Sequence, residues 1–176
     1  DNRAYMDESH VLATEESARA IFEQWSTYYD LSCSWLIEKS PPNLIRTRFL
    51  QALFRNSKFI VILRHPIAVA YATKKWTASP IGTLLEHALL ACELFSSDSR
   101  MLNHVYVLRY EDFVLHPQDS ISDICDFLGL SRFGISKTVL KNVNEKYFTM
   151  WGRDQRNMLK RLLLRVPEGL EERANR

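Results

Sequence analysis

The chain has 176 residues, of which 46% are hydrophobic and 25% are charged, as is usual for a globular domain that buries a normal core. Its formal net charge of +2 is too small to indicate general binding to nucleic acids, although it allows a basic pocket for one anion. No segment approaches the roughly 20 consecutive apolar residues that a membrane-spanning helix needs. We therefore expect a single domain over residues 1–176, without a nucleic-acid partner and without a membrane span in this segment.

The cysteines and histidines do not indicate a metal site. Cys33, Cys92 and Cys125 are odd in number, lie far apart and form no CxxC pair, so we expect buried free thiols. The histidines show no spacing typical of zinc ligands, and no metal cofactor is expected. His87 lies on the apolar face of a predicted helix, which is typical of a histidine in the core.

The first predicted elements are a helix and a short strand. Thr14 is a suitable N-cap, because two glutamates follow in the first turn, where the helix dipole favours anions. Apolar residues continue at helical spacing to Tyr29. The apolar run 35–37 predicts a strand, which must end before Pro41 and Pro42 because prolines cannot continue a sheet ladder.

A second helix, a second strand and a third helix follow. Asn43 is a suitable N-cap for the second helix. The residues of this helix that we expect to be buried are Leu44, Ile45, Phe49, Ala52 and Leu53, and those that we expect to point outward are Arg46, Arg48 and Gln51. The apolar run 58–63 predicts the strand. Pro66 suits the first turn of the next helix, which we expect to continue to Trp76.

The remaining elements alternate in the same way. A long helix is predicted over 83–95 and a third strand over 105–108. Another helix follows Pro117 and ends at Gly129, which suits the left-handed position after a helix. Shorter helices are predicted over 136–141 and 156–165.

These elements predict an α/β domain in which helices flank a parallel β-sheet. Short runs rich in Ile and Val that alternate with helices are typical of such domains. Three strands make a thin sheet with exposed edges. We therefore expect a further strand before residue 1, so that residues 1–176 are part of a domain that is truncated at its N-terminus.

Charged residues follow each predicted strand. In a parallel sheet, ligands bind beyond the carboxyl ends of the strands, so Glu38, Lys39 and Arg64 are candidates for one site. An arginine before a helix N-terminus suits an anion, because the guanidinium forms a bidentate fork and the helix offers free N–H groups. A carboxylate there suits proton abstraction, and a lysine suits stabilisation of developing negative charge. Solvated strand boundaries and surface ion pairs explain the same residues without a function, and residues 110–112 also suit a simple helix cap.

The sequence resembles the sulfotransferases that use 3′-phosphoadenosine 5′-phosphosulfate (PAPS) in three ordered blocks. Residues 36–43 read LIEKSPPN, which is similar to the EKSP segment of heparan-sulfate-type and related bacterial enzymes. Residues 58–72 read KFIVILRHPIAVAYA, similar to the strand, turn and helix that bind the 3′-phosphate. Residues 107–130 read VLRYEDFVLHPQDSISDICDFLGL, similar to the family's YED and FLGL block. The resemblance implies a P-loop-like sulfotransferase fold with PAPS as co-substrate.

The resemblance also implies roles for individual residues. Glu38 falls at the general base that deprotonates the acceptor, and Lys39 at the adjacent lysine that faces the same site. Arg64 falls at the arginine that grips the 3′-phosphate. Tyr110 begins the YED segment, which lies near the nucleotide in cytosolic members of the family.

Some family features are absent from this sequence. The family serine eight positions after the arginine falls at Ala72, and the neighbouring Thr73 is the candidate to replace its hydroxyl, although neighbouring helix positions differ by about 100°. The position of the catalytic histidine of the cytosolic enzymes falls at Pro41. The PKSGTT-like loop that wraps the 5′-phosphosulfate does not occur, and neither does a GxxxxGK[ST] or GxGxxG loop. We expect the first of these loops upstream of Asp1, and a chain limited to residues 1–176 to be inactive or very weak.

The sequence leaves alternatives open. Beside a sulfotransferase acting on a hydroxyl or amine, it fits an inactive sulfotransferase-like module that binds a nucleotide or a partner. A third alternative is a P-loop kinase relative with the same sheet. The acceptor can be a glycan, a protein or a small molecule, and the EKSP block favours carbohydrate.

Overall fold

The computed structural model describes residues 4–163, with side chains up to residue 157. Within this range the sheet has two parallel strands, β1 (Phe59–Leu63) and β2 (Val105–Arg109), paired in register from end to end. The α-helices in chain order are α1 (Glu15–Ser26), α2 (Thr47–Leu53), α3 (Pro66–Thr73), α4 (Ile81–Asp98), α5 (Tyr110–Leu115), α6 (Pro117–Leu128) and α7 (Glu145–Leu163). Three short 3₁₀ helices are η2 (Pro41–Ile45), η3 (Lys74–Trp76) and η4 (Ser99–Met101).

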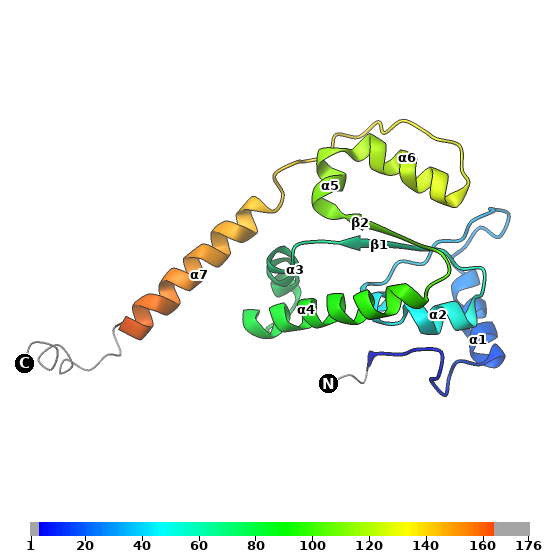
Figure 1. Ribbon diagram of the computed structural model, residues 1–176, viewed down its shortest axis with the longest axis horizontal. Coiled ribbons are helices and arrows are strands. Elements are labelled where there is room, and N and C mark those ends of the chain that lie inside the picture. Colours follow the sequence, from blue (N-terminus) through cyan, green and yellow to red (C-terminus); the bar gives the residue numbers. More distant parts are fainter. Residues whose placement is uncertain (1–3, 164–176) are drawn as a thin grey trace, which may run out of the picture.

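Helices flank the sheet, as the sequence predicts for this fold class. The parallel pairing requires a crossover connection, and α3 and α4 supply it between β1 and β2. In Figure 1, α3 and α4 lie on one side of the sheet, and α5 and α6 lie on the other. Both strands point toward the side where α3 begins, so their carboxyl ends lie together.

The buried apolar residues come from the sheet and from most of the helices around it. They are Phe49, Val61, Ala68, Ala70, Tyr71, Leu84, Phe95, Leu108, Val114, Cys125 and Tyr147. One cluster, made of Ala68, Tyr71 and Tyr147, joins α3 to α7. This cluster lies near the carboxyl ends of the strands and positions the start of α7 there.

Several helix ends are where the sequence predicts them. Thr14 caps α1, because its hydroxyl oxygen accepts a hydrogen bond from the Ser17 N–H at 3.2 Å. Pro66 and Pro117 occupy the first turns of α3 and α6, where a missing N–H costs nothing. Gly129 ends α6 with φ of 75°, which is the left-handed conformation that glycine adopts without steric cost.

The predicted strand over 35–37 is wrong. These residues form no regular secondary structure, and Ile37 is 77% exposed. A strand needs a neighbour for its backbone hydrogen bonds, and the described part of the chain pairs only β1 with β2. The prolines that follow, Pro41 and Pro42, form η2. The predicted sheet of three strands is therefore a sheet of two within residues 4–163.

The predicted helix after Asn43 is wrong in its start and in part of its buried face, although Phe49 is buried as predicted. Asn43 lies inside η2, and the α-helix begins only at Thr47. The buried residues of α2 are Thr47 and Phe49, whereas Ala52 is exposed. Arg48, predicted to point outward, is half-buried because it binds two carboxylates, and one of them, Asp98, is itself buried.

Other predictions need smaller corrections. No regular structure forms over the predicted helix 136–141, whereas the last predicted helix is part of α7 and begins earlier, at Glu145; residues 164–165 lie outside the described range. His87 is exposed and is no core residue. The cysteines are free thiols, but only Cys125 is fully buried, since Cys92 is half-buried and Cys33 is exposed.

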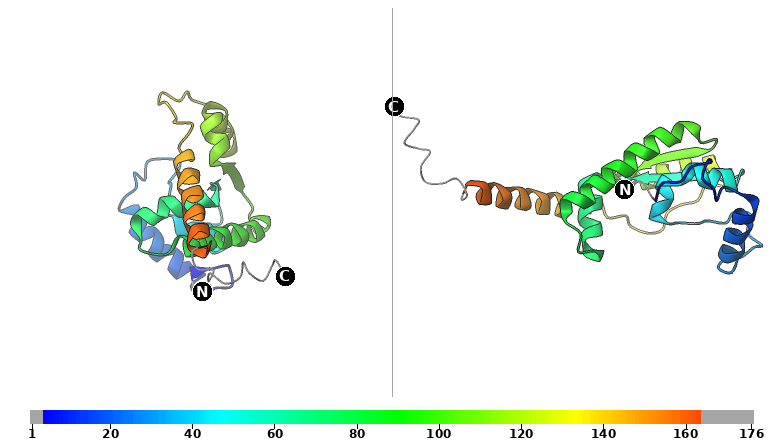
Figure 2. Two further views of the ribbon diagram at one scale, coloured as in Figure 1. Left: turned by 90° about the vertical axis from the view of Figure 1, so that its left-hand side faces the viewer. Right: turned by 90° about the horizontal axis from the view of Figure 1, so that it is seen from below.

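Helix α7 leaves the body of the molecule after its first turns. Figure 1 and Figure 2 both show it projecting beyond α3 and α4. The contacts that hold its start are the packing of Tyr147 and Trp151 against α3 and a hydrogen bond from the Tyr71 hydroxyl to Asp154 at 2.5 Å. Among the described residues, no helix is both long enough and apolar enough to cross a membrane.

Candidate functional site

Arg64 lies directly after β1, at the carboxyl end of the sheet. Its Nε and Nη2 both donate to the Asn144 side-chain oxygen, at 2.9 and 2.6 Å. The guanidinium carbon lies 4.4 Å from the centre of the Tyr110 ring and 5.3 Å from that of Tyr147. These are cation–π distances. The guanidinium is therefore held along one edge by Asn144 and lies close to two aromatic rings.

The Glu111 carboxylate links this arginine to both strand ends. Its Oε1 accepts the His65 N–H at 3.1 Å and the Asn144 side-chain N–H at 2.7 Å. Burial raises the pKa of the Glu111 carboxyl, but these hydrogen bonds, one from its own backbone and the charge of Arg109 lower it by more. The net pKa lies below the usual value, so Glu111 is charged at neutral pH.

The surroundings of Arg64 remain electropositive. Among the described residues, no carboxylate forms an ion pair with its guanidinium, because the hydrogen-bonded partner is a neutral amide. Lys75 and Lys146 lie 5.6 and 5.0 Å from the centre of the Tyr147 ring. Burial raises the pKa of Tyr147, but a hydrogen bond to Lys75 and the charges of Lys146, Lys75 and Arg64 lower it by more. An anion brought here would meet several positive charges.

The start of α3 is capped by its own sequence. His65 accepts a hydrogen bond from the Ile67 N–H through Nδ1 at 3.3 Å, and Pro66 has no N–H. The sequence leads us to expect free N–H groups at this helix end, and this expectation is wrong for Ile67. The positive character of the site therefore rests on Arg64 and the nearby lysines more than on helix N–H groups.

Ala72, which falls at the family serine position, and Thr73, the candidate to replace that serine, differ in their surroundings. Ala72 packs against the cluster of Ala68, Tyr71 and Tyr147. Thr73 is exposed in the last turn of α3, about 100° further around the helix. A hydroxyl on Thr73 is therefore accessible to solvent, whereas position 72 faces the core.

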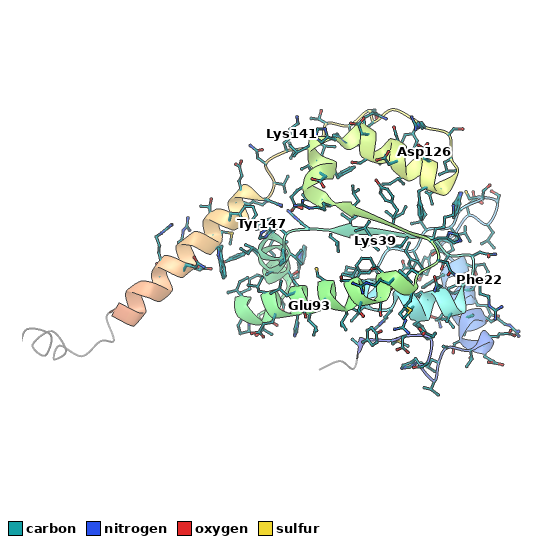
Figure 3. The ribbon with its side chains drawn as sticks, viewed as in Figure 1. Phe22, Lys39, Glu93, Asp126, Lys141 and Tyr147 are labelled. Atoms are coloured by element: carbon teal, nitrogen blue, oxygen red, sulfur yellow. The ribbon has the colours of Figure 1, made fainter. Side chains whose placement is uncertain are left out.

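Glu38 and Lys39 lie apart from the group around Arg64. Both are exposed on the irregular connection between α1 and η2, and Glu38 accepts a hydrogen bond from the Asn43 side chain at 3.3 Å. In the part of the chain that the structure describes, no hydrogen bond or ion pair joins either residue to Arg64. Figure 3 shows Lys39 beside the sheet and Tyr147 at the junction of α3 and α7. The structure thus unites Arg64 with Tyr110 but leaves Glu38 and Lys39 separate.

Glu111, Asn144 and Tyr147 also belong to the group around Arg64, but the sequence alone assigns no role to them. Glu111 belongs to the Tyr110-Glu111-Asp112 run at a strand end, and this position alone is a usable signal. Asn144 and Tyr147 follow a segment without secondary structure and carry no motif. They reach Arg64 only because α7 begins beside α3.

Two surface depressions lie outside the group around Arg64, and no metal site is found among the described residues. Depressions of about 380 and 310 Å³ lie against the N-terminal segment, and neither is lined by a strand-end residue. The first is lined partly by Arg48, Arg55 and Glu8. Within the described residues, no group of three or more His, Cys, Asp or Glu side chains is arranged to hold a metal ion.

Comparisons with known proteins identify the family. The model of the sulfotransferase family matches residues 1–133, which is more than half of the chain. The sulfotransferase domain from the curacin biosynthetic pathway is a similar solved structure, with a TM-score of 0.53 and 22% sequence identity over 67% of this chain and 45% of that one. At this identity the likeness shows the fold alone, and this chain spans less than half of that domain. A search of curated proteins found no match. The family match, together with the shared fold, shows that the chain belongs to the sulfotransferase family.

Proposed function

We propose that this protein transfers a sulfuryl group from PAPS to a hydroxyl or amine acceptor, with Arg64 as the clamp for the 3′-phosphate of the nucleotide. The observation that carries the proposal is the position of Arg64 and the lack, within the described residues, of a carboxylate paired with its guanidinium. Arg64 lies after β1 at the carboxyl end of the sheet, inside the region that the family model matches, and no carboxylate of the described chain neutralises it. Ligands of parallel α/β sheets bind at this edge, and a guanidinium is suited to a phosphate.

The other proposed roles follow the positions of the residues. Tyr110 lies against Arg64 and is proposed to contact the nucleotide. The exposed hydroxyl of Thr73 is proposed to replace the family serine as a ligand of the phosphate. In the reaction, Glu38 takes the proton of the acceptor while the acceptor oxygen or nitrogen bonds to sulfur. The bond from sulfur to the phosphate oxygen breaks, 3′,5′-ADP leaves, and Lys39 stabilises the negative charge. The EKSP block favours a carbohydrate acceptor.

A second function, nucleotide binding without transfer, is favoured by one observation. Glu38 and Lys39 are exposed, and in the described structure neither forms a hydrogen bond or ion pair with the group around Arg64. A base must lie within hydrogen-bond reach of the proton it removes when the substrate is bound. If the connection over 35–40 keeps its place in the nucleotide complex, the protein binds the nucleotide but transfers nothing.

Calorimetry with 3′,5′-ADP and a transfer assay with PAPS test both functions. Removal of charge-assisted hydrogen bonds to a phosphate costs about tenfold or more in affinity. We expect the wild-type protein to bind 3′,5′-ADP and Arg64→Ala to bind it at least about tenfold more weakly. Arg55→Ala serves as the matched control, because it removes an exposed arginine that lies before β1 and away from the carboxyl ends of the strands. It is expected to bind 3′,5′-ADP normally.

The transfer assay then separates the two candidates. A sulfotransferase transfers label from PAPS to an amine or a sugar hydroxyl, and Glu38→Gln lowers the turnover without changing the affinity for 3′,5′-ADP. Binding of 3′,5′-ADP without any transfer supports the second candidate only in a longer protein that also carries the phosphosulfate loop, because a chain limited to residues 1–176 is expected to be inactive or very weak. If the wild-type protein does not bind 3′,5′-ADP, or Arg64→Ala binds as tightly as wild type, the proposed clamp is wrong.

A further inference from the structure

We propose that Asn144, oriented by Glu111, is a positioning residue that holds the Arg64 guanidinium so that its outer edge faces a phosphate. The inference rests on the proposed function, in which Arg64 binds the 3′-phosphate. It adds a specific use for Glu111, the second residue of the YED block, and for Asn144. One of them, Asn144, lies beyond the family match, which ends at residue 133.

The hydrogen bonds of Arg64 leave a defined set of donors. A guanidinium has five N–H groups in a fixed plane. The Nε–H and one Nη2–H lie along one edge, and both are directed at the Asn144 oxygen, at 2.9 and 2.6 Å. The second Nη2–H and one Nη1–H form the end of the fork, and the described residues offer them no hydrogen bond. This end is a bidentate site for two phosphate oxygens.

The Glu111 carboxylate determines which way the Asn144 amide faces. Its Oε1 lies 2.7 Å from the Asn144 nitrogen, and a carboxylate can only accept. A flipped amide would place its oxygen against the carboxylate and its NH₂ against the guanidinium, and both contacts would be repulsive. The Glu111 acceptor oxygen therefore holds the Asn144 NH₂ group and directs the Asn144 oxygen toward Arg64. The same Oε1 accepts the His65 N–H, so the orienting group is bound to the backbone next to Arg64.

An asparagine suits this position because it is neutral. A carboxylate in its place would form an ion pair with the guanidinium and would cancel the charge that attracts a phosphate. The rings of Tyr110 and Tyr147 lie 4.4 and 5.3 Å from the guanidinium carbon and limit the room in which the side chain can move. The arginine is thus oriented by groups that do not neutralise it, and less side-chain entropy is lost when an anion binds.

The test compares the affinities of variants for 3′,5′-ADP and for 5′-AMP, which lacks the 3′-phosphate. Asn144→Ala and Glu111→Ala are expected to weaken 3′,5′-ADP binding by roughly three- to tenfold, because a side-chain hydrogen bond is worth about 1 kcal/mol. Both variants should bind 5′-AMP as wild type does. Glu111→Gln keeps an oxygen acceptor and should stay within about twofold of wild type. Asn142→Ala, an exposed asparagine two positions away, is the matched control and should bind both nucleotides normally.

The outcomes separate this inference from the proposed function. If Arg64→Ala binds 3′,5′-ADP normally, the clamp itself is wrong, and the positioning role falls with it. If Arg64→Ala weakens binding but Asn144→Ala matches Asn142→Ala, only the positioning role is overturned. An equal loss for 3′,5′-ADP and 5′-AMP shows a general structural defect and also overturns it. If Glu111→Gln is as weak as Glu111→Ala, Glu111 does not act through its acceptor oxygen.

Discussion

Among single residues, the Glu111 carboxylate joins the two strand ends to the start of α7. It lies in the first turn of α5 after β2, and it accepts hydrogen bonds from the His65 N–H after β1 and from the Asn144 side-chain amide before α7. Its hydrogen bonds are stronger while the carboxylate is charged, because a neutral carboxyl is a weaker acceptor. The contribution of Glu111 to stability therefore depends on pH.

We predict that this contribution is lost in acid. The pKa of Glu111 is lower in the folded protein than its usual value of 4.5. A group with a depressed pKa stabilises the fold above its unfolded pKa, and this stabilisation disappears as the pH falls through the folded pKa. At pH 7, Glu111→Gln should lower the free energy of unfolding by about 1 kcal/mol, since charge-assisted hydrogen bonds become neutral ones. Urea unfolding between neutral pH and pH 3 should show the difference between variant and wild type shrinking; a constant difference contradicts the prediction.

Among the elements, α6 shows how one residue ends a helix. Gly129 has φ of 75°, its N–H bonds to the Asp126 carbonyl, and the Leu130 N–H bonds to the Cys125 carbonyl at 2.8 Å. This is the Schellman arrangement, which satisfies the last carbonyls of a helix. Open space surrounds the position where a Cβ would lie. The need for glycine is therefore conformational and does not come from crowding.

Gly129→Ala should destabilise the protein by about 1 kcal/mol, because an L-residue pays a steric cost in the left-handed region. The change is measured as a shift of the urea midpoint at constant m value. Gly134→Ala is the matched control, since Gly134 also has open space but no positive φ. It should be neutral or slightly stabilising. Equal losses in both variants would show that the cost at Gly129 is not due to its φ.

Helix α7 depends on α3 for its place. Tyr147, 4% exposed, packs between residues of α3, and Asp154 accepts the Tyr71 hydroxyl. Burial and the contact with Asp154 raise the pKa of Tyr71 well above its usual range, so this hydroxyl keeps its proton at neutral pH. These contacts bring Asn144 to Arg64, so that the proposed positioning depends on a helix packed against another helix.

At the scale of the whole molecule, Arg48 ties the N-terminal segment to the body. It lies in α2, pairs with Glu8 of that segment, and bonds to Asp98 at the end of α4 at 3.4 Å. The Tyr5 hydroxyl also donates to Asp98, at 2.8 Å. Asp98 is 2% exposed, and these partners offset the cost of burying its carboxylate.

Arg48→Met should destabilise the protein by about 2 kcal/mol, because it leaves the buried Asp98 without a positive partner. The N-terminal segment should also detach and become sensitive to limited proteolysis. Arg55→Met, an exposed arginine just after α2, should change the stability by less than about 0.5 kcal/mol. If the two variants unfold at the same urea concentration, the buried pair does not hold the segment.

The sequence by itself determined the elements whose signals are local. Thr14, Pro66, Pro117 and Gly129 act on residues within one turn, so the helix ends they mark are confirmed. The α/β class and the family blocks also depend on short runs, and the family match confirms the membership that they indicate.

Only the tertiary structure decided which residues meet. Arg64 and Asn144 are 80 positions apart, and His65 and Glu111 are 46 apart, so their contacts depend on how β1, β2 and α7 pack. The same reason explains the error at 35–37. The apolar run predicts a strand there, but in the described chain no neighbouring strand pairs with it. Residues that contact each other but lie far apart in the sequence leave no local sequence pattern. Burial of the core, and not their spacing in the sequence, brings them together.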